Sequence, residues 1–192
     1  MTARLKAASG FTLIELMVVG AIVGFLVLIA IPNYFVWNSK YKLKSAVAEL
    51  HADFGLARMA AMNQNTSVTV TVTQTSSTTP VTVTFRDANG SEVFPSLTLD
   101  PEVSLTNDSG VLVGGVVKSP QDVRFNSKGL RVNTGNDNNL CIDDSSGNYT
   151  GASCDNSHRQ AFNFRNTGSF NYRIVVATTG KVSWCYTNTC AQ

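Results

Sequence analysis

The chain has 192 residues, of which 43% are hydrophobic and 15% are charged, and its formal net charge is +2. This composition suits one membrane helix followed by one globular domain. The nearly balanced charge gives no sign of a polyanionic partner, which would call for a strongly basic chain.

The N-terminus joins a short basic leader to a long apolar run. The leader ends at Gly10, and almost every side chain from Phe11 to Val36 is apolar. A run of about 20 such residues is long enough to cross a bilayer as a helix. The run also holds Glu15, and a carboxylate costs roughly 2.5–3.5 kcal/mol at the centre of a membrane helix, so Glu15 is the first candidate functional residue. An ordinary secretory signal ends its apolar run at the cleavage site, whereas this leader ends before the run begins.

The stretch Ser9-Gly10-Phe11-Thr12-Leu13-Ile14-Glu15, together with Pro32, resembles the prepilin signal of type IV pilins and type II secretion pseudopilins. The resemblance implies that a membrane peptidase cleaves after Gly10 and that the new N-terminus at Phe11 is methylated. It divides the chain into a leader (1–10), a transmembrane and polymerisation half-helix (11–37) and a periplasmic domain (38–192). Removal of the leader would leave 13 basic and 13 acidic side chains.

The resemblance also implies a role for Glu15 in assembly. Inside a filament its carboxylate would lie among packed apolar helices, where an unpaired charge is very costly. The implied partner is the methylated amine of Phe11, from a neighbouring subunit or from the same chain, because methylation leaves that amine cationic. Such a pair would select the axial register of an entering subunit.

Beyond Val36 the apolar character narrows to a stripe at spacings of four and three, which indicates one face of a helix. The stripe consists of Leu43, Val47, Leu50, Phe54, Ala57 and Ala61. We therefore predict one helix from about Phe11 to about Gln64, roughly 80 Å long. The charged residues between the stripe positions are expected on a solvated face: Lys42, Lys44, Glu49, Asp53 and Arg58.

Gly24 and Pro32 weaken the first half of this helix. Proline costs about 3 kcal/mol in a helix interior and glycine about 1 kcal/mol relative to alanine. Membrane helices tolerate both residues, so a simple kink is one interpretation. The other follows from the resemblance to pilins, in whose assembled filaments the stretch between matching glycine and proline positions can unwind.

After Asn65 the hydrophobic pattern changes to a period of two, which is typical of half-buried strands. Hairpins are predicted at Val68–Val72 with Val81–Phe85, followed by a turn at Asp87–Gly90, and at Tyr172–Ala177 with Lys181–Tyr186. Other strands are predicted at Glu92–Leu99, Val111–Lys118, Val123–Phe125 and Leu130–Val132, and residues 133–157 are predicted to be mostly loop. The predicted fold class is α+β, with an antiparallel sheet packed against the stripe of the long helix.

Three further motifs resemble the GspH/FimT group of minor pilins and pseudopilins: Leu56-Ala57-Arg58-Met59-Ala60-Ala61, Val123-Arg124-Phe125-Asn126 with Gly129, and Ile174-Val175-Val176 before Gly180-Lys181-Val182. The resemblance implies a pilin-like fold and a minor type IV pilin, a structural subunit that acts in pilus assembly or initiation, near the tip. Implied partners are major and minor pilins, the prepilin peptidase and the assembly platform. The implied location is the inner membrane, crossed once with the C-terminal domain in the periplasm, and then the pilus.

Three alternatives remain open within this resemblance. The first is a GspH-like pseudopilin of type II secretion, and the second is a major fibre subunit. The third is a pilin that binds DNA in natural transformation, for which Arg173 and Lys181 are the candidate residues. The family usually has an arginine where Lys181 stands, and basic residues exceed acidic ones by only two from Gln121 onward, so DNA is the less favoured partner.

The four cysteines lie in the last third of the chain and predict two disulfides in an oxidising compartment. Cys185 with Cys190 and Cys141 with Cys154 is the preferred pairing of the three that are possible. Zinc bound by Cys141, Cys154 and His158 is the alternative. Asn136–Asn139, Asp143 and Asp144 offer oxygen ligands for calcium, although turn chemistry explains them equally well. We expect no resident metal or other cofactor, and no catalytic residues, because no catalytic motif occurs.

Overall fold

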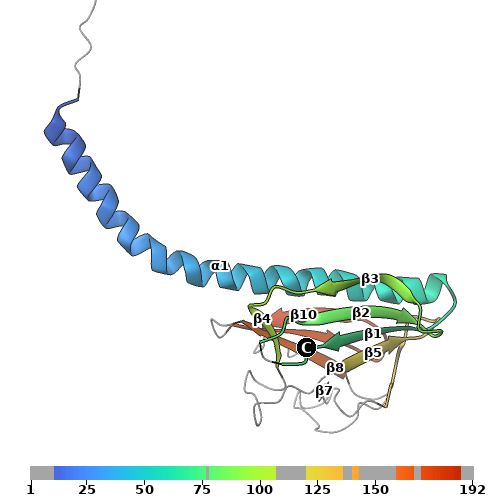
Figure 1. The fold of residues 1–192 in the computed structure, drawn as a ribbon. Coiled ribbons are helices and arrows are strands. Elements are labelled where there is room, and N and C mark those ends of the chain that lie inside the picture. Colours follow the sequence, from blue (N-terminus) through green and yellow to red (C-terminus); the bar gives the residue numbers. More distant parts are fainter. Residues whose placement is uncertain are drawn as a thin grey trace, which may run out of the picture. The chain divides into compact units, whose positions relative to one another are not determined.

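The computed structural model describes residues 11–76, 78–106, 120–135, 140–142, 159–166 and 170–186. Over these residues the chain forms one long helix, α1 (Leu13–Asn63), and ten strands. The chain divides into two compact units, Met1–Asn38 and Ser39–Gln192, so that α1 contributes its first half to one unit and its second half to the other. In the second unit the helix packs against antiparallel sheets, which confirms the predicted α+β fold (Figure 1).

Helix α1 ends where the sequence predicted, in the cluster of amides after Met62. Asn65 adopts a left-handed conformation with φ of 50°. The amide of Thr66 donates to the carbonyl of Ala61 at 3.1 Å, and the amide of Asn65 donates to the carbonyl of Met62 at 3.3 Å. This pair of bonds is a Schellman cap, in which asparagine replaces the usual glycine.

The predicted stripe on the second half of α1 is the helix's contribution to the core. All six stripe residues are fully buried. The prediction for the charged residues between them was only partly correct. Lys44 and Glu49 are exposed, whereas Lys42, Asp53 and Arg58 are half-buried along the flanks of the helix, where they approach the sheets.

The first sheet holds five strands in the order β3-β2-β1-β5-β6, and all neighbours are antiparallel. Val70 of β1 lies opposite Phe85 and Val123, and these three side chains are buried. Thr71, next in β1, is half-buried on the outer face, as the alternating pattern predicted. The strands are β1 (Val68–Thr73), β2 (Thr82–Asp87), β3 (Glu92–Thr98), β5 (Gln121–Phe125) and β6 (Arg131–Val132).

The second sheet has the order β10-β9-β8-β4, with β7 also paired to β8. Its last hairpin confirms the prediction, but β4, β7 and β8 were not predicted. Strands β4 and β7 are too short to show a period, and β8 carries polar residues on a buried face. The predicted strand Val111–Lys118 lies outside the described residues. The strands are β4 (Val103–Thr106), β7 (Leu140–Ile142), β8 (Arg159–Asn166), β9 (Asn171–Val176) and β10 (Val182–Tyr186).

One core joins the second half of α1 to both sheets. The ring of Phe54 on α1 meets that of Phe162 on β8 edge to face, with centroids 5.2 Å apart. The two sheets are also linked directly, because Gln160 Nε2 donates to the carbonyl of Asp122 at 2.7 Å. The sheets and half of the helix therefore form a single packed body within Ser39–Gln192.

Candidate functional site

Helix α1 begins with a local hydrogen bond that involves the candidate assembly residue. The amide of Glu15 donates to Thr12 Oγ1 at 3.3 Å, so Thr12 acts as the N-cap. Threonine followed three residues later by glutamate has the spacing of a capping box. We did not predict this cap, although its spacing is visible in the sequence. A carboxylate in the first turn is also favourable near the positive end of the helix dipole. Glu15 and Phe11 are exposed, and the predicted cleavage residue Gly10 lies outside the described residues.

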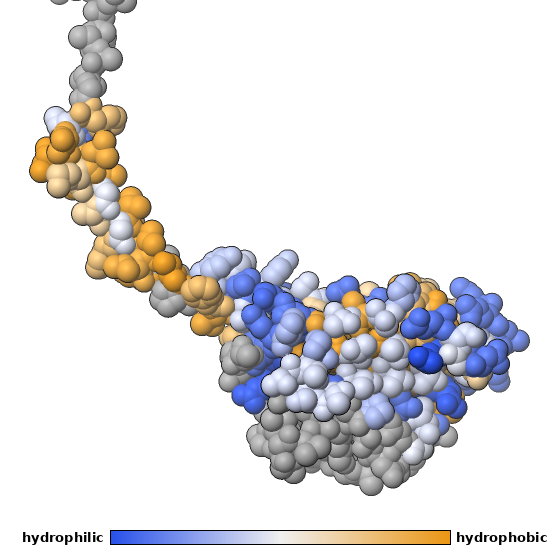
Figure 2. Space-filling view, in the orientation of Figure 1, coloured by the Kyte–Doolittle hydropathy of each residue, from blue (hydrophilic) through white to orange (hydrophobic). Residues whose placement is uncertain are grey.

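The first half of α1 exposes apolar side chains on all its faces. Figure 2 shows this half as a mostly hydrophobic surface, and the large apolar side chains from Phe11 to Trp37 are 46–84% exposed. Soluble proteins rarely expose contiguous apolar patches of more than a few hundred Å², so this surface implies a lipid or protein environment. Among the described residues, no single helix is long and apolar enough for a membrane span, and only the bent pair Leu13–Ile29 and Tyr34–Asn63, taken together, meets that criterion of length and composition.

Gly24 and Pro32 both lie within the bounds of α1, but only Pro32 lies at the break between its segments Leu13–Ile29 and Tyr34–Asn63. A Cβ added at Gly24 would meet no atom within 4 Å outside the local helix backbone, so this glycine leaves open space for a neighbour. Unwinding between the two residues in an assembled filament stays a prediction.

Both described cysteines, Cys141 on β7 and Cys185 on β10, are disulfide-bonded. Cys154, Cys190 and His158 lie outside the described residues, so the preferred pairing stays a prediction. Among the residues that the structure describes, no group of three or more His, Cys, Asp and Glu side chains is placed to hold a metal ion. The oxygen-rich stretch considered for calcium lies outside that part of the chain.

The two residues proposed for DNA differ in their environment. Lys181 is exposed directly after the β9–β10 turn. Arg173 on β9 is only 7% exposed, and its Nε donates to Asn163 Oδ1 on the adjacent β8 at 2.7 Å. A guanidinium buried in this way is a structural partner for a buried amide and does not face a phosphate backbone. The structure therefore does not support Arg173 as a DNA-binding residue.

The three GspH/FimT-like motifs, distant in sequence, meet around Arg58 on α1. Arg58 Nε donates to the carbonyl of Gly129 at 2.8 Å, and Nη2 donates to the carbonyl of Thr179 at 3.2 Å. Gly129 belongs to the turn between β5 and β6, and Thr179 with Gly180 belongs to the turn between β9 and β10. We call Arg58, Gly129, Thr179 and Gly180 the Arg58 junction.

Glycine is required at both turns of the Arg58 junction. Gly129 and Gly180 have φ of +71° and +74°, a conformation that other residues rarely adopt. A Cβ on Gly180 would overlap the carbonyl oxygen of Gly129, and one on Gly129 would lie 2.7 Å from Met62 Sδ. The junction thus fastens a turn of each sheet to the helix. The sequence motifs were visible, but their meeting point depends on the tertiary fold.

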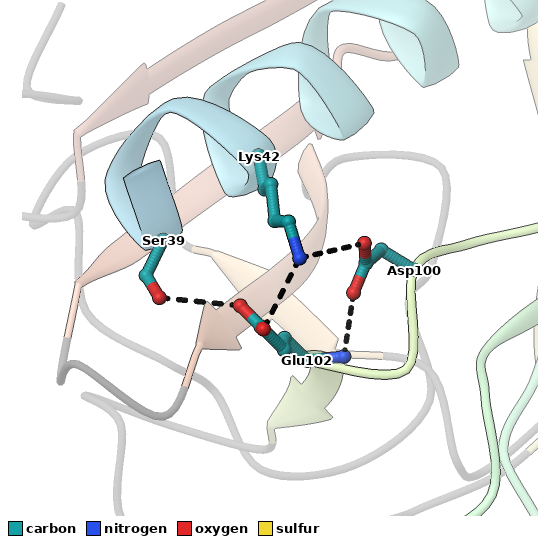
Figure 3. Close-up of polar contacts among 4 residues, drawn as sticks. All are labelled: Ser39, Lys42, Asp100 and Glu102. Atoms are coloured by element: carbon teal, nitrogen blue, oxygen red, sulfur yellow. Dashed lines mark hydrogen bonds and ion pairs between the residues drawn. The ribbon is translucent and has the colours of Figure 1, made fainter. Parts of the chain in front are cut away.

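A second polar cluster fastens the start of the domain (Figure 3). Lys42 Nζ lies 3.1 Å from Glu102 Oε1 and 3.3 Å from Asp100 Oδ2, and Ser39 Oγ donates to Glu102 Oε2 at 3.2 Å. Hydrogen bonds to Glu102 and then to Asp100 raise the pKa of Lys42 above its ordinary value. The cluster connects α1 to the segment between β3 and β4. Partly exposed ion pairs of this kind contribute little to stability, so its main effect is to position that segment.

Comparison with known proteins places these motifs in a family. The sequence model described as "Type II transport protein GspH" matches residues 46–180, a span that contains the whole Arg58 junction. Two fimbrial proteins of Pseudomonas aeruginosa are each 50% identical over 48 residues, which are 25% of this chain. The matched segment spans 31% of each of those proteins.

Two crystal structures of the type IV minor pilin FimU of Pseudomonas aeruginosa are also similar. One has a TM-score of 0.46 at 13% identity and covers 80% of this chain and 95% of that protein. The other has a TM-score of 0.44 at 14% identity and covers 77% and 95%. The family match alone covers more than half of the chain, and by that match the chain belongs to the GspH family.

Proposed function

We propose that this chain is a minor type IV pilin, a structural subunit that enters a filament through the first half of α1. The observation that carries the proposal is the exposed apolar first half, with Glu15 in its first turn. Its membership of the GspH family, which consists of pilins and pseudopilins, supports the same conclusion. The work of such a subunit is assembly, near the tip or in an initiating complex, and involves no catalysis or cofactor.

The physical basis is that this half-helix exposes apolar side chains on all its faces, which is unfavourable in water. Before assembly, lipid would cover the apolar side chains, and after assembly other pilins would cover them. In a filament the Glu15 carboxylate would lie in an apolar interior, where removing one partner of a buried ion pair costs about 3–5 kcal/mol. The cationic N-terminus at Phe11, produced by cleavage after Gly10, would be that partner. Correct register would therefore be favoured over any axial shift.

A second candidate is a pseudopilin of type II secretion, and the description of the matching family favours it. The same half-helix and the same Glu15 would serve in a periplasmic filament in place of a surface fibre. In both cases we propose as partners other pilin-like subunits, the prepilin peptidase and the inner-membrane assembly platform. In both cases the chain would start as a single-pass inner-membrane protein.

The test is to follow the full chain in cells from precursor to filament. Intact mass spectrometry should find a mature N-terminus at a methylated Phe11, and immunoblotting should find the protein in sheared surface filaments. Recovery only when the type II secretion machine is present, in a filament that does not reach the surface, would support the pseudopilin. A protein that keeps residues 1–10 and enters neither filament would contradict both candidates.

A further inference from the structure

Two cavities of about 260 and 210 Å³, with no lining residue in common, lie one after the other along the seam between the second half of α1 and strand β3. The helix lines them with residues spaced four apart, which lie along one side of a helix: Tyr41, Ser45, Glu49 and Asp53. The other wall runs continuously from Phe94 to Asp100, along β3 and the segment after it. We call this feature the α1–β3 groove.

Acidic residues outnumber basic ones in the lining of the α1–β3 groove, where Glu49, Asp53 and Asp100 face Lys42 alone. Glu49 and Asp53 lie one helical turn apart, a spacing at which like charges repel each other. Within the described part of the chain, neither carboxylate forms an ion pair, and Lys42 at the end of the groove is already engaged by Asp100 and Glu102. Burial, and then the charge of Glu49, raise the pKa of Asp53. The fold thus keeps two like charges one helical turn apart, with Glu49 lining the first cavity and Asp53 lining the second.

Only the second cavity is mostly apolar, and strand β3, which lines it, is an edge strand. Phe85 is buried beneath the second cavity, and Phe94 and Leu97 pack against the core while they line it. Among the described strands, β3 pairs only with β2, so its other side is an edge. An extended peptide can add to such an edge through main-chain hydrogen bonds, with side-chain pockets that give specificity. Lysine and arginine suit this groove, because their alkyl stems pack on apolar surface while the charged head stays outside.

We propose that the α1–β3 groove receives an extended basic segment of a neighbouring pilin-family subunit. A lysine or arginine of that segment lays its stem on Phe94 and Leu97 and pairs with Glu49 and Asp53. The inference rests on the proposed function, since it assumes that subunits meet in a filament. It adds a specific contact on the globular domain to the packing of the apolar half-helices.

The experiment uses the full chain in cells that assemble filaments. A photoreactive amino acid replaces Ser96, an exposed residue that lines the groove. Irradiation should crosslink the chain to a pilin-family subunit, and mass spectrometry should map the crosslink to a peptide with a lysine or arginine. The double variant Glu49→Gln/Asp53→Asn should lower the yield about tenfold, the effect of losing roughly 1.4 kcal/mol of pairing. Glu92→Gln, an exposed residue of β3 that does not line the groove, is the matched control and should leave the yield unchanged.

Three outcomes would overturn the groove proposal: crosslinks only to lipid, crosslinks to a peptide without a basic residue, or an undiminished yield from the double variant. Misfolding does not explain a lower yield if the double variant melts at or above the wild-type temperature, as the removal of charge repulsion predicts. Recovery of the chain in filaments separates the two proposals. A chain that enters filaments without groove crosslinks contradicts the groove alone, whereas a chain absent from filaments contradicts the proposed function.

Discussion

The two halves of α1 are both rich in apolar residues, but only in the second half does the chain's own domain bury those residues. In the second half six apolar side chains form one stripe, and each is fully buried by the chain's own sheets. In the first half the apolar residues surround the helix, and the large ones remain 46–84% exposed. The difference shows that the distribution of apolar residues around a helix, more than their number, decides whether one domain can bury all of them. The second half is part of the folded domain, whereas the first half leaves its large apolar side chains exposed.

The largest expected effect is the difference in stability between a phenylalanine-to-alanine substitution in the second half of α1 and one in the first half. Phe54→Ala should destabilise the domain by about 3–5 kcal/mol, because it removes a buried ring that packs on Phe162. Phe25→Ala should change the free energy of unfolding of the domain by less than about 0.5 kcal/mol, since Phe25 is 65% exposed. Urea denaturation of the full chain in detergent, followed by circular dichroism, measures both. Similar losses from the two variants would contradict the division of α1.

The Arg58 junction gives a second comparison, within the folded half. Gly180→Ala places a Cβ at a positive φ and against the carbonyl oxygen of Gly129. Gly90→Ala has a similar φ of +81° but meets no atom within 4 Å. We expect a loss of about 1–2 kcal/mol for Gly90→Ala from the backbone alone and about 1–3 kcal/mol more for Gly180→Ala from overpacking. Thermal unfolding measures the difference between the two variants. Equal losses of stability would show that the turns of Gly180 and Gly129 can move apart without an energetic cost.

Arg58 itself should contribute less than the glycines around it. Arg58→Gln removes two hydrogen bonds from a charged donor, for which we expect a loss of about 1.5–3 kcal/mol. Hydrogen exchange at the β5–β6 and β9–β10 turns should quicken in this variant. Lys44→Gln, an exposed residue of the same helix, is the control and should change stability by less than about 0.5 kcal/mol. Unchanged exchange at both turns would mean that Arg58 does not hold them together.

The smallest effect concerns Asp53 and has the opposite sign. Since its pKa is raised in the folded state, the folded domain binds a proton there more readily than the unfolded chain does. Its charge therefore destabilises the fold above that pKa, and the penalty vanishes as pH falls below the ordinary aspartate value. Asp53→Asn should gain about 0.2–0.5 kcal/mol at pH 7, the size of a like-charge pair one turn apart. Melting temperatures from pH 3 to pH 7 test this, and a loss of stability at pH 7 would refute it.

Patterns that are local in sequence predicted much of this fold. The four-three spacing of the stripe identified the face of α1 that is buried, and the strict alternation of Val68–Val72 identified a half-buried strand. Strand β8 was missed because Gln160 and Asn163 are buried, which is possible only when partners such as the main chain of Asp122 and the side chain of Arg173 are brought to them. No pattern within β8 reveals those partners.

The candidate site shows the same limit. The spacing of Thr12 and Glu15 is local, so it would have been sufficient to predict a capping box. The Arg58 junction joins residues 71 and 121 positions apart, so the sequence could provide its three motifs but not their contact. Arg173 was a candidate because it is a basic residue on the last hairpin of a FimT-like sequence, whereas in the structure it is buried opposite Asn163 in the register of β8 and β9.

The most direct test of assembly through the first half of α1 is the share of the chain that enters filaments when Glu15 is changed. Glu15→Gln should still be inserted and cleaved, but its share in sheared filaments, measured by quantitative immunoblotting, should fall about a hundredfold. This is the expected size for a buried cation left without its partner, at roughly 3 kcal/mol. Thr12→Ala, which removes only the helix cap, should be incorporated far better. Normal incorporation of Glu15→Gln, or equal losses from both variants, would contradict the claim that the first half of α1 packs against other subunits in a filament and that Glu15 forms an ion pair there.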